Sequence, residues 1–525
     1  MKVACIQMRA GSVHEYQETY ARILQLTERA GKERAQLTVL PECAYPAYFL
    51  GLDIDKLKES LAMNDRLLSD IATLAKRYGM YVAVGLVTER EGKLYNSAVM
   101  IDPAGRQINM VDKSNMWHFD GKWFTSGSDY GVFDTVFGTM GMMVCADGRL
   151  PEIARILALQ GARVIVDPVN LAAAASDPKM LSNQQYQFIL QARAAENGAW
   201  LLVADKVGLE GGCASYLGRS MVIDPDGNIV ACASTDEEEI LYHDVNPEQT
   251  PRTPPIARMP VLYQLLDKPN EMLAACRDAE KSLAMKDCEI FTTVTQFASA
   301  SANEYIEKAA HYLSCGKHMG SRLVLLPQSL FDMDAIVDAL IRRIPESIIA
   351  VASGKDREGV KCAAAFSAQG KQDIWRKTHA SANGEIVSNE LFHCADTACG
   401  KLGVIFDEEA YVPEIARSYM LDGCNILLWA DSAARSMNLK MMQTRCAENK
   451  MFMARSSCDP HDDACICDTE GRILTSTFTG VEQAASGMIV YPLSLAKSVV
   501  PGTDVLFGRT SGSYGELTKI HPEAQ

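Results

Sequence analysis

The feature that most constrains this chain is an internal repeat. Residues 141–161 (GMMVCADGRLPEIARILALQG) and residues 403–423 (GVIFDEEAYVPEIARSYMLDG) align without a gap, at an offset of 262 positions. Both segments begin and end on glycine, and both contain the same pentapeptide, PEIAR. Because a repeat of this kind carries one pattern of buried and turn positions twice, it indicates that the chain folds as two copies of one unit.

Shorter echoes keep the same order along the chain, although their offset drifts. They are ACIQM (4–8) and TVTQF (293–297), LTVLPE (37–42) and LVLLPQ (323–328), and RAAEN (193–197) and RCAEN (445–449). Loop lengths therefore differ between the copies while the order of elements is retained. We expect a first domain at 1–263, a linker at 264–286 and a second domain at 287–525.

Within the first copy, apolar runs alternate with helical patterns. A helix is expected over about 14–30, and another begins at Pro151 and stops at Gly161. The all-apolar run GMMVC at 141–145 and the run RVIVD at 163–167 are typical of strands that are buried on both faces. We therefore predict an α/β fold in which sheets are covered by helices.

Composition and charge exclude several classes of partner. The 525 residues include 51 Lys and Arg against 66 Asp and Glu, giving a net charge of −15 without any basic block. Neither a nucleic acid nor an anionic membrane is therefore expected as a partner. We find no signal peptide after Met1 and no apolar run of about 18 residues. With these features, the 16 cysteines indicate reduced thiols and a cytoplasmic location.

Three side chains stand where strands end. Cys145 follows an apolar run just before a turn and a helix, a position that favours a thiolate. Glu42 follows a second apolar run, and Lys113 follows another predicted strand. Considered one at a time, each residue has an ordinary interpretation. Cys145 would be a buried structural cysteine, and the two charged residues would be solvent-exposed ends of strands. Together, three such ends can converge on one cleft, because α/β sheets place ligands at the carboxyl ends of their strands.

Four motifs in the first copy, taken together, resemble the nitrilase superfamily of carbon–nitrogen hydrolases. They are LPECAYPAY, DKSNMWHFD, GMMVCADGRLPEIAR and RAAENGAWLLVAD, and they cover essentially all of the first copy in order. The resemblance implies an αββα sandwich in each copy. It also implies a Glu-Lys-Cys triad made of Glu42, Lys113 and Cys145.

The resemblance implies the following chemistry. Glu42 takes the proton of the Cys145 thiol, passes it to the departing ammonia or amine, and later activates water. Lys113 and the backbone N–H of Ala146 face the oxyanion. A thioester intermediate is then hydrolysed, so that neither a metal nor an organic cofactor is needed.

The remaining site residues are less firmly placed. Members of the superfamily often carry a second acid, a glutamate, shortly after the lysine; here Asp120 is the nearest carboxylate, and His118 is its rival. Trp117, Tyr45 and Asn170 are expected either to line the pocket or simply to pack in the core.

The substrate is expected to be a small amide or ureido (N-carbamoyl) compound. Ala146-Asp147-Gly148-Arg149 follows the cysteine where nitrilases proper usually have Trp-Glu. Hydrolysis of a small nitrile at the same thiol is the second interpretation, and acyl transfer from the thioester to an amine is the third. A binding or scaffold protein that has lost turnover is the alternative from another class.

The second copy is expected to be degenerate. In the repeat register, Gln328 replaces Glu42, Lys377 matches Lys113 and Asp407 replaces Cys145. A carboxamide is no base at neutral pH, and a carboxylate is a poor nucleophile toward an amide. Superfamily members commonly pair subunits through helices beside the active site, so we expect the second copy to act as an intrachain partner, with further homo-oligomerisation left open.

One segment of the second copy holds four soft metal ligands. Cys458, His461, Cys465 and Cys467 fall within ten residues, and they would suit zinc. Their spacing matches no ribbon or finger pattern, so we expect a reduced loop without a metal.

Overall fold

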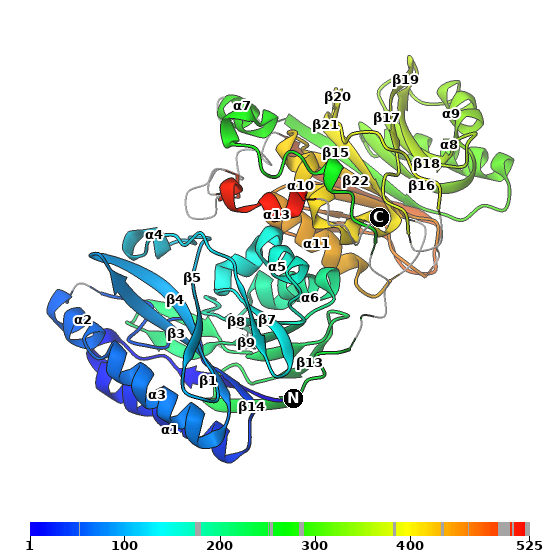
Figure 1. The fold of residues 1–525 in the computed structure, drawn as a ribbon. Helices are drawn as coiled ribbons and strands as arrows, with labels where there is room; N and C mark the ends of the chain where they lie inside the picture. Colours follow the sequence, from blue (N-terminus) through cyan, green and yellow to red (C-terminus); the bar gives the residue numbers. More distant parts are fainter. Residues whose placement is uncertain are drawn as a thin grey trace. The chain divides into compact units, whose positions relative to one another are not determined.

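The structure is a computed structural model of the 525-residue chain. It describes all residues except 52, 174–179, 250, 252–255, 283–287, 382–384, 432–434, 460, 492–504, 507–508 and 520–525. The chain divides into two compact units, Met1–Thr253 (unit 1) and Pro254–Gln525 (unit 2). In Figure 1, unit 1 runs from blue to green and unit 2 from green to red.

Unit 1 contains two sheets. The first has the order β11-β10-β1-β2-β3-β4-β5, with β14 also paired to β1, and the second has the order β13-β12-β9-β8-β7-β6. The strands of the first sheet are β1 (Lys2–Arg9), β2 (Leu37–Val39), β3 (Tyr81–Arg90), β4 (Lys93–Ile101), β5 (Gln107–Asp112), β10 (Lys206–Glu210), β11 (Ala214–Leu217) and β14 (Glu239–Asp244). Those of the second are β6 (Val132–Thr135), β7 (Gly138–Met142), β8 (Val164–Pro168), β9 (Trp200–Ala204), β12 (Met221–Ile223) and β13 (Ile229–Cys232).

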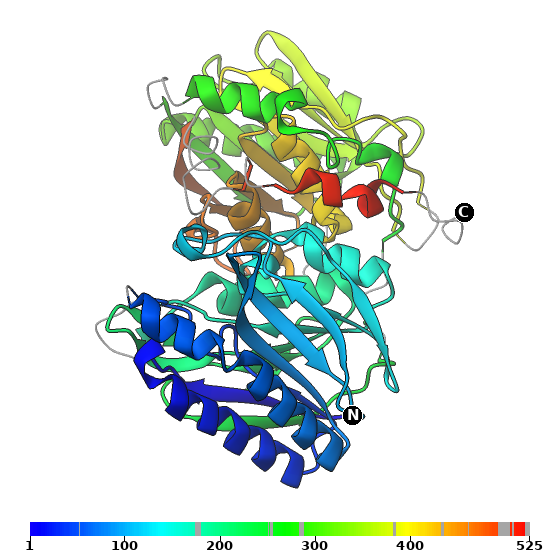
Figure 2. The same ribbon diagram turned by 60° about the vertical axis from the view of Figure 1, so that its left-hand side comes forward.

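The two sheets of unit 1 lie between helices. One core, which includes Val3 and Val39 from the first sheet and Val164 from the second, fills the space between the sheets. A second core joins the outer face of the first sheet to α1 (Tyr16–Lys32) and α3 (Asn64–Tyr78). Helices α5 (Pro151–Leu159) and α6 (Leu190–Asn197) lie beside the second sheet, as Figures 1 and 2 show. The layers are thus helix, sheet, sheet and helix.

Strand direction brings the three predicted active-site residues to the ends of their strands. Strands β1, β2 and β3 run parallel, and β5 runs in the same direction because β4 is antiparallel to both β3 and β5. In the second sheet, β7, β8 and β9 also run parallel. Glu42 follows β2, Lys113 follows β5 and Cys145 follows β7, so each side chain emerges at a carboxyl end.

Unit 2 also places helices against sheet, although its strands form one continuous sheet. Its order is β19-β18-β17-β16-β15-β23-β22-β21-β20, with β26 paired to β15 and with β24 paired to β23 and β25. The strands are β15 (Cys288–Gln296), β16 (Leu323–Asp332), β17 (Ile349–Lys355), β18 (Lys361–Ser367), β19 (Gly370–Arg376), β20 (Ala395–Thr397), β21 (Gly400–Phe406), β22 (Ile426–Asp431), β23 (Phe452–Ser457), β24 (Cys465–Cys467), β25 (Ile473–Ser476) and β26 (Gln483–Tyr491).

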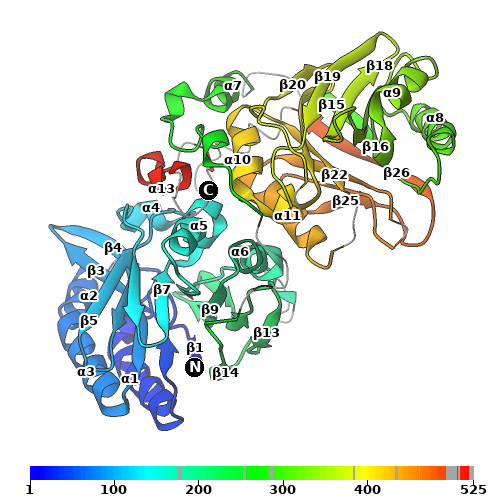
Figure 3. The ribbon, with the colours of Figure 1, turned by 45° about the vertical axis from the view of Figure 1, so that its right-hand side comes forward.

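Two cores hold unit 2 together. One lies between the β15–β19 half and the β20–β25 half of the sheet and includes Leu325, Val404 and Leu428. The other joins β16, β17 and β18 to α8 (Ala302–His318) and α9 (Met333–Ile341). Figure 3 shows α8 and α9 beside these strands, and α10 (Pro413–Leu421) and α11 (Asn438–Asn449) beside β22.

The connector belongs to unit 2. Whereas the sequence placed the end of the first domain at 263 and a linker at 264–286, the structure divides the chain between 253 and 254. The Tyr263 hydroxyl lies 2.6 Å from His379 Nε2, and Arg258 Nε lies 2.9 Å from Glu414 Oε1. The expected connector helix is α7 (Ala274–Ser282), and Lys401 Nζ reaches its Asp278 at 2.7 Å. These contacts bind the segment to unit 2, which composition alone does not indicate.

The predicted helices and strands of the first copy are largely present. The helix expected over 14–30 is α1, and the helix expected from Pro151 is α5, after which Gly161 adopts φ +99°. The strand expected at 141–145 is shorter than predicted, because β7 ends at Met142 and Cys145 opens a 3-10 turn. Within the described residues, no helix is both long and apolar enough to cross a bilayer.

We predict that Gly85→Ala destabilises unit 1 and lowers turnover. A Cβ at Gly85 would lie 2.7 Å from Glu42 Cα and 2.8 Å from Cys43 N, and would also meet the Pro41 carbonyl. Backbone atoms cannot move aside cheaply, so the cost is about 1–3 kcal/mol, as for other overpacked cores. Denaturant unfolding measures it. Gly131→Ala is the control, because nothing lies within 4 Å of its added Cβ; equal midpoints for the two variants would contradict the prediction.

Candidate active site

The site is organised around the ammonium group of Lys113. Its Nζ lies 2.9 Å from Glu42 Oε1 and 2.8 Å from Asp120 Oδ2, with the lysine side chain 2% exposed and both carboxylates fully buried. Burial by itself lowers the pKa of Lys113, but the negative charges of Asp120 and Glu42 outweigh it and raise the pKa well above its usual value. Lys113 is therefore a permanent cation held between two acids.

Each of the two carboxylates has one oxygen atom that accepts no hydrogen bond from the described residues. Glu42 Oε1 also accepts a 2.6 Å hydrogen bond from Asn96 Nδ2, and Asp120 Oδ2 accepts a 2.6 Å bond from the Trp117 N–H. Glu42 Oε2 and Asp120 Oδ1 are buried and have no hydrogen-bond partner among the residues that the structure describes. Buried acceptors of this kind are costly unless a ligand or water supplies a donor. The site therefore offers two oxygen acceptors to an incoming molecule.

Cys145 stands on a strained turn. Its backbone adopts φ +50°, a left-handed conformation that non-glycine residues rarely adopt and that is often retained at functional sites. The Cys145 N–H donates to Asp167 Oδ1 at 2.8 Å, and its thiol lies 3.7 Å from the Asn170 carbonyl oxygen. The residue is 6% exposed, so it lies almost entirely within unit 1.

The thiolate expected at Cys145 is corrected by the structure. Burial raises the pKa of the thiol well above its usual value, and the negative charge of Glu42 raises it further, while the opposing effect of Lys113 is smaller. The helix dipole cannot compensate, because the residue opens a five-residue 3-10 turn (Cys145–Arg149) and α5 starts only at Pro151. The resting nucleophile is therefore a neutral thiol that needs a base.

A carboxylate that sequence reasoning did not select ties the lysine segment to the cysteine turn. Asp147 Oδ1 accepts hydrogen bonds from the N–H groups of Ser114 (3.0 Å) and Asn115 (2.8 Å), and Asp147 Oδ2 accepts one from the Val144 N–H (3.0 Å). Burial raises the pKa of Asp147 to about 6, against the lowering effect of these donors. Only the folded arrangement reveals this link, because Asp147 resembles an ordinary turn residue in the sequence.

The two rivals for the second acid lie in different environments. The structure places Asp120 against Lys113, whereas His118 is exposed. Partial burial and the nearby Arg149 lower the pKa of His118. Its ring packs edge-on against Trp117, with 5.3 Å between the ring centroids. The carboxylate is therefore the residue that shares the ammonium.

The other expected lining residues separate into two groups. Asn170 is buried, and neither polar atom of its side chain has a partner among the described residues, so its amide is available to a ligand. The Ala146 carbonyl oxygen accepts a 2.7 Å hydrogen bond from Asn115 Nδ2. The Arg149 guanidinium lies over the Trp117 ring, with its Cζ 4.1 Å from the ring centroid. Tyr45 is packed in the core, where its hydroxyl donates to the Ser60 carbonyl at 3.0 Å.

A buried ion pair supports the cysteine turn from α6. Arg193 lies 2.6 Å from Glu196, and its Nε donates to the Gly148 carbonyl at 2.9 Å. The same arrangement recurs in unit 2, where Arg445 pairs with Glu448 and its Nε donates to the Ala410 carbonyl at 2.9 Å. The charges in the RAAEN motif therefore have a structural role in both units.

The soft-ligand segment of unit 2 does not form a metal cluster. Cys465 and Cys467 are buried on β24, and His461 is exposed. Across the described parts of both units, no group of three or more His, Cys, Asp or Glu side chains is arranged to hold a metal ion.

Comparison with known proteins matches unit 1. The family model described as carbon-nitrogen hydrolase matches residues 2–254. A nitrilase from Pyrococcus abyssi is 32% identical over 247 residues, covering 46% of this chain and 87% of the relative. An omega-amidase, NIT2, from Bos taurus is 28% identical over 259 residues, covering 47% and 88%. The crystal structure of an amidase from Nesterenkonia sp. aligns with 25% identity and a TM-score of 0.41, covering 47% of this chain and 90% of that one.

The residues and the comparisons together define a thiol-dependent hydrolase of carbon–nitrogen bonds. A buried cysteine on a strained turn, with a glutamate and a lysine whose charges act on its thiol, is the chemical arrangement that such a hydrolase needs. The chain belongs to the carbon–nitrogen hydrolase family, the nitrilase superfamily.

We predict that Glu42→Gln makes Cys145 easier to alkylate while it abolishes turnover. Glu42 raises the pKa of the Cys145 thiol, so removal of its charge lowers that pKa and moves the pH dependence of alkylation toward lower pH. Iodoacetamide labelling, followed by mass spectrometry across a pH series, measures the shift. Cys145→Ser controls for labelling at the other cysteines. A curve displaced to higher pH in Glu42→Gln would contradict the electrostatic account.

Proposed function

We propose that unit 1 hydrolyses small primary amides or terminal ureido groups, with Cys145 as nucleophile and Glu42 as general base. Lys113, with the Ala146 N–H, stabilises the oxyanion that forms on the substrate carbonyl. Oxyanion donors of this kind are typically worth roughly 2.7–4 kcal/mol each in the transition state. Asp120 acts as the second acid, by sharing the Lys113 ammonium and by contacting the substrate nitrogen.

The reaction proceeds in two halves. Glu42 takes the proton from Cys145 Sγ as the sulfur bonds to the substrate carbonyl carbon, and the carbonyl π electrons move to oxygen. The C–N bond then breaks, the nitrogen receives the proton from Glu42, and ammonia leaves a thioester. In the second half Glu42 takes a proton from water, hydroxide adds to the thioester carbon, and the C–S bond breaks as sulfur regains a proton.

The two unpartnered carboxylate oxygens favour an amide nitrogen over a nitrile. Glu42 Oε2 and Asp120 Oδ1 are buried acceptors without a donor among the described residues. The nitrogen of a primary amide or a terminal ureido group carries two N–H donors, whereas a nitrile nitrogen carries none. A site that presents acceptors discriminates strongly against a molecule that cannot donate to them.

Nitrile hydrolysis is the second candidate. A thiol adds to a nitrile carbon with the same base and cation, and the relative from Pyrococcus abyssi is named a nitrilase. The relative from Bos taurus is named an omega-amidase, which favours the amide. An ammonia-release screen over primary amides, ureido acids and nitriles separates the candidates, with Cys145→Ala as the blank.

We predict that Asp120→Asn lowers kcat/KM for primary amides roughly 10- to 100-fold, since a hydrogen bond to a charged group contributes about 1.5–3 kcal/mol. The substitution keeps the size of the side chain but removes the charge beside Lys113. Nitrile turnover, if present, is expected to fall less, because a nitrile donates no hydrogen bond. Steady-state kinetics on an amide and nitrile pair with the same substituent measures the ratio. An unchanged ratio would remove Asp120 from substrate discrimination.

We further propose that unit 2 is a duplicated, degenerate copy of unit 1, each with the nitrilase-like αββα sandwich. The order β19-β18-β17-β16-β15, with β26 beside β15, matches β5-β4-β3-β2-β1 with β14 beside β1. The order β25-β24-β23-β22-β21-β20 likewise matches β13-β12-β9-β8-β7-β6. Asp407 opens a 3-10 turn with φ +44°, as Cys145 does with φ +50°. The shared strand order and strained turn support a common origin.

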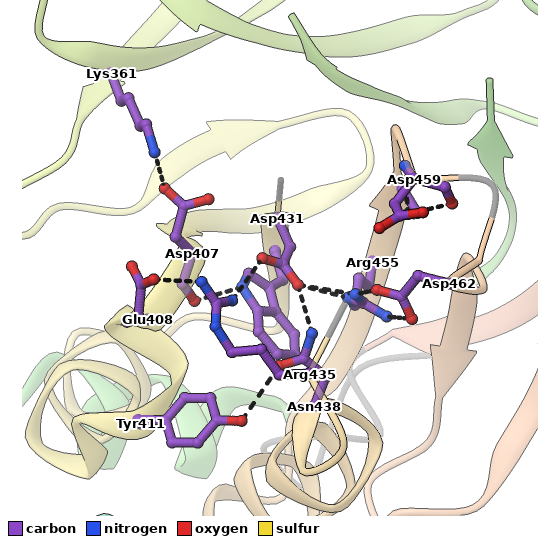
Figure 4. A network of polar contacts seen from close by, with 12 residues as sticks. Lys361, Asp407, Glu408, Tyr411, Asp431, Arg435, Asn438, Arg455, Asp459 and Asp462 are labelled. Atoms are coloured by element: carbon purple, nitrogen blue, oxygen red, sulfur yellow. Dashed lines mark hydrogen bonds and ion pairs between the residues drawn. The ribbon is translucent and has the colours of Figure 1, made fainter. Parts of the chain in front are cut away.

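The polar groups around Asp407 differ from those around Cys145 in a coordinated way. Lys377 donates its backbone N–H to the Lys361 carbonyl, as Lys113 does to Asn96, so Lys361 occupies the position of Asn96. The Lys361 ammonium pairs with the buried Asp407 carboxylate, as Figure 4 shows. The new carboxylate at the nucleophile position is therefore matched by a new cation.

The network continues through further ion pairs. Arg435 pairs with Glu408 and lies 3.2 Å from Asp431, which in turn lies 2.8 Å from Arg455 (Figure 4). Lys377 lies 2.6 Å from Glu385. A carboxylate neutralised in this way is a poor nucleophile, and Gln328 provides no base.

If unit 2 is non-catalytic, Cys145→Ala abolishes all turnover, and residual Asp407-dependent turnover would contradict the proposal.

Unit 2 has a second proposed role, which would explain why both units are part of one chain. We propose that it serves as an intrachain partner for unit 1, in the place that a second subunit takes in superfamily members that pair. Light scattering on the active enzyme tests this idea. A chain that is active only as a larger assembly would argue against it.

We predict that Lys361→Met destabilises unit 2 by about 1–3 kcal/mol, because the buried Asp407 charge then loses its closest cation. Lys361→Met combined with Asp407→Asn is expected to recover most of the loss, since the charge is removed together with its partner. Calorimetry of the full chain measures both variants. Lys371→Met, which breaks an exposed pair with Asp334, is the control and is expected to cost no more than about 1 kcal/mol. Equal losses for the single and double variants would contradict the pairing.

A further inference from the structure

The segment that carries Glu42 into the site is contacted by a buried ion pair on β10. Lys206 Nζ lies 2.8 Å from Glu210 Oε2, and the side chains are 2% and 0% exposed. Neither residue belongs to the Glu-Lys-Cys set, and neither is marked by a sequence motif. A fully buried pair of charges is costly to desolvate, so its retention calls for a specific role.

Both members of the pair hold the segment 43–49, which follows Glu42 directly. Lys206 Nζ donates to the Cys43 carbonyl at 2.8 Å, and Glu210 Oε1 accepts from the Phe49 N–H at 2.5 Å. Beyond Glu210, a Cβ on Gly211 would lie 2.8 Å from the Phe49 ring, so the β10–β11 turn packs closely on that ring. The ion pair thus fixes the first and last residues of the segment.

The backbone beside Glu42 needs such support. Cys43 adopts φ +40°, a left-handed conformation that a cysteine rarely adopts unless its surroundings impose it. The neighbouring sheet bonds lie on either side of it, from the Leu40 N–H to the Ala83 carbonyl and from the Val87 N–H to the Tyr45 carbonyl, each at 2.9 Å. Between these bonds, the Cys43 carbonyl is directed to Lys206 on β10.

The strand that carries the pair is itself fixed. β10 runs parallel to β1, with Met8 opposite Lys206, and the Ala10 N–H donates to the Val207 carbonyl at 2.9 Å. Asp205 Oδ1 accepts the Lys206 N–H at 2.8 Å. The Lys206 ammonium is therefore held at a fixed place relative to the first sheet, which also carries Glu42 and Lys113.

Unit 2 provides an internal comparison. The RAAEN and RCAEN motifs set a register in which Cys458 stands at the position of Lys206 and Asp462 at that of Glu210. The sheet pairing agrees, because Ser457 lies opposite Gln296 on β15, one residue before this position. In the unit in which Gln328 stands at the position of Glu42, a thiol therefore replaces the ammonium. The Asp462 carboxylate pairs instead with buried Arg455, whose Nη1 donates to Asp462 Oδ1 at 2.9 Å.

We infer that Lys206 and Glu210 are positioning residues that hold Glu42 in its productive orientation. The pair sets the path of the backbone next to Glu42 and so directs Oε2, the free oxygen, toward the reacting thiol. This inference deepens the proposed function and rests on Glu42 acting as the general base. The pair acts on catalysis only through Glu42, because its hydrogen bonds reach the Cys43 carbonyl and the Phe49 N–H, at the two ends of the segment that follows Glu42.

The test is a double-mutant cycle with Lys206→Met and Glu42→Asp in the full chain, assayed on a primary amide. Glu42→Asp keeps a carboxylate but shortens the side chain by one methylene, so turnover is expected to fall and stay measurable. Lys206→Met is expected to lower kcat about 10- to 100-fold with KM changed less than about twofold, because a misplacement of about 1 Å costs up to about 10² in rate. In the Glu42→Asp background, in which the base is already misplaced, Lys206→Met is expected to cause little further loss. Independent, multiplying losses would overturn the inference.

Two further measurements separate positioning from general damage. Iodoacetamide labelling of Cys145 in Lys206→Met is expected to stay within about twofold of wild type, since the pair does not contact the thiol; parallel losses of labelling and turnover would overturn the inference. Asp102→Asn is the matched control for stability, because Asp102 is buried in the β4–β5 turn and accepts the Ala104 and Arg106 N–H groups. It is expected to lower the melting temperature without changing kcat.

Glu210→Gln refines the result, because it preserves an acceptor for the Phe49 N–H while removing the charge that faces Lys206. The loss of kcat is expected to be smaller than that of Lys206→Met, and a larger loss would overturn the greater role given to Lys206.

Failure of the proposed function would give a different result. If Glu42→Gln retains turnover, Glu42 is not the base; if Glu42→Gln is inactive while Lys206→Met matches wild type, only the inference fails.

Discussion

The structure of unit 1 depends on one buried cation shared by two buried anions. Lys113 could not remain charged at 2% exposure without Glu42 and Asp120, and the two carboxylates could not remain buried without Lys113. The surrounding contacts keep these three groups in place: Asn96 holds Glu42, Asp147 fixes the backbone after Lys113, and Gly85 leaves room for the segment that carries Glu42. The three charged groups of the proposed active site therefore also contribute to the stability of unit 1.

The same main-chain design supports different chemistry in the two units. A left-handed residue opens a short 3-10 turn before a helix in both, and an arginine from a later helix, α6 in unit 1 and α11 in unit 2, holds that turn. Cys145 and Asp407 occupy this position with opposite consequences, because a neutral thiol needs only a neighbouring base, whereas a buried carboxylate needs cations. In unit 2 the Asp407 carboxylate pairs with Lys361, within the charge network of Figure 4.

Sequence patterns predicted the order of elements in unit 1, and they singled out Glu42, Lys113 and Cys145 because each lies just beyond a predicted strand. The structure confirms that position for strands β2, β5 and β7. They left Asp120 and His118 as rivals, since only the folded loop shows which one meets Lys113. Asn96 lies within β4, and Lys206 and Glu210 lie on a short strand, where nothing in the alternation of residues marks a role. The charge state of Cys145 was wrongly predicted, because it depends on the balance between burial, Glu42 and Lys113. The structure divides the chain ten residues before the predicted boundary at 263, because segment 258–263 packs on unit 2, a contact that the sequence does not show.

The raised pKa of Cys145 has a consequence for the lifetime of the enzyme. Peroxide attacks thiolates far more readily than neutral thiols, and oxidation beyond the sulfenic acid is essentially irreversible. A sulfur that stays protonated at rest and only 6% exposed is shielded from that damage between turnovers. The burial that raises the pKa of the Cys145 thiol therefore also favours slow oxidation of its sulfur.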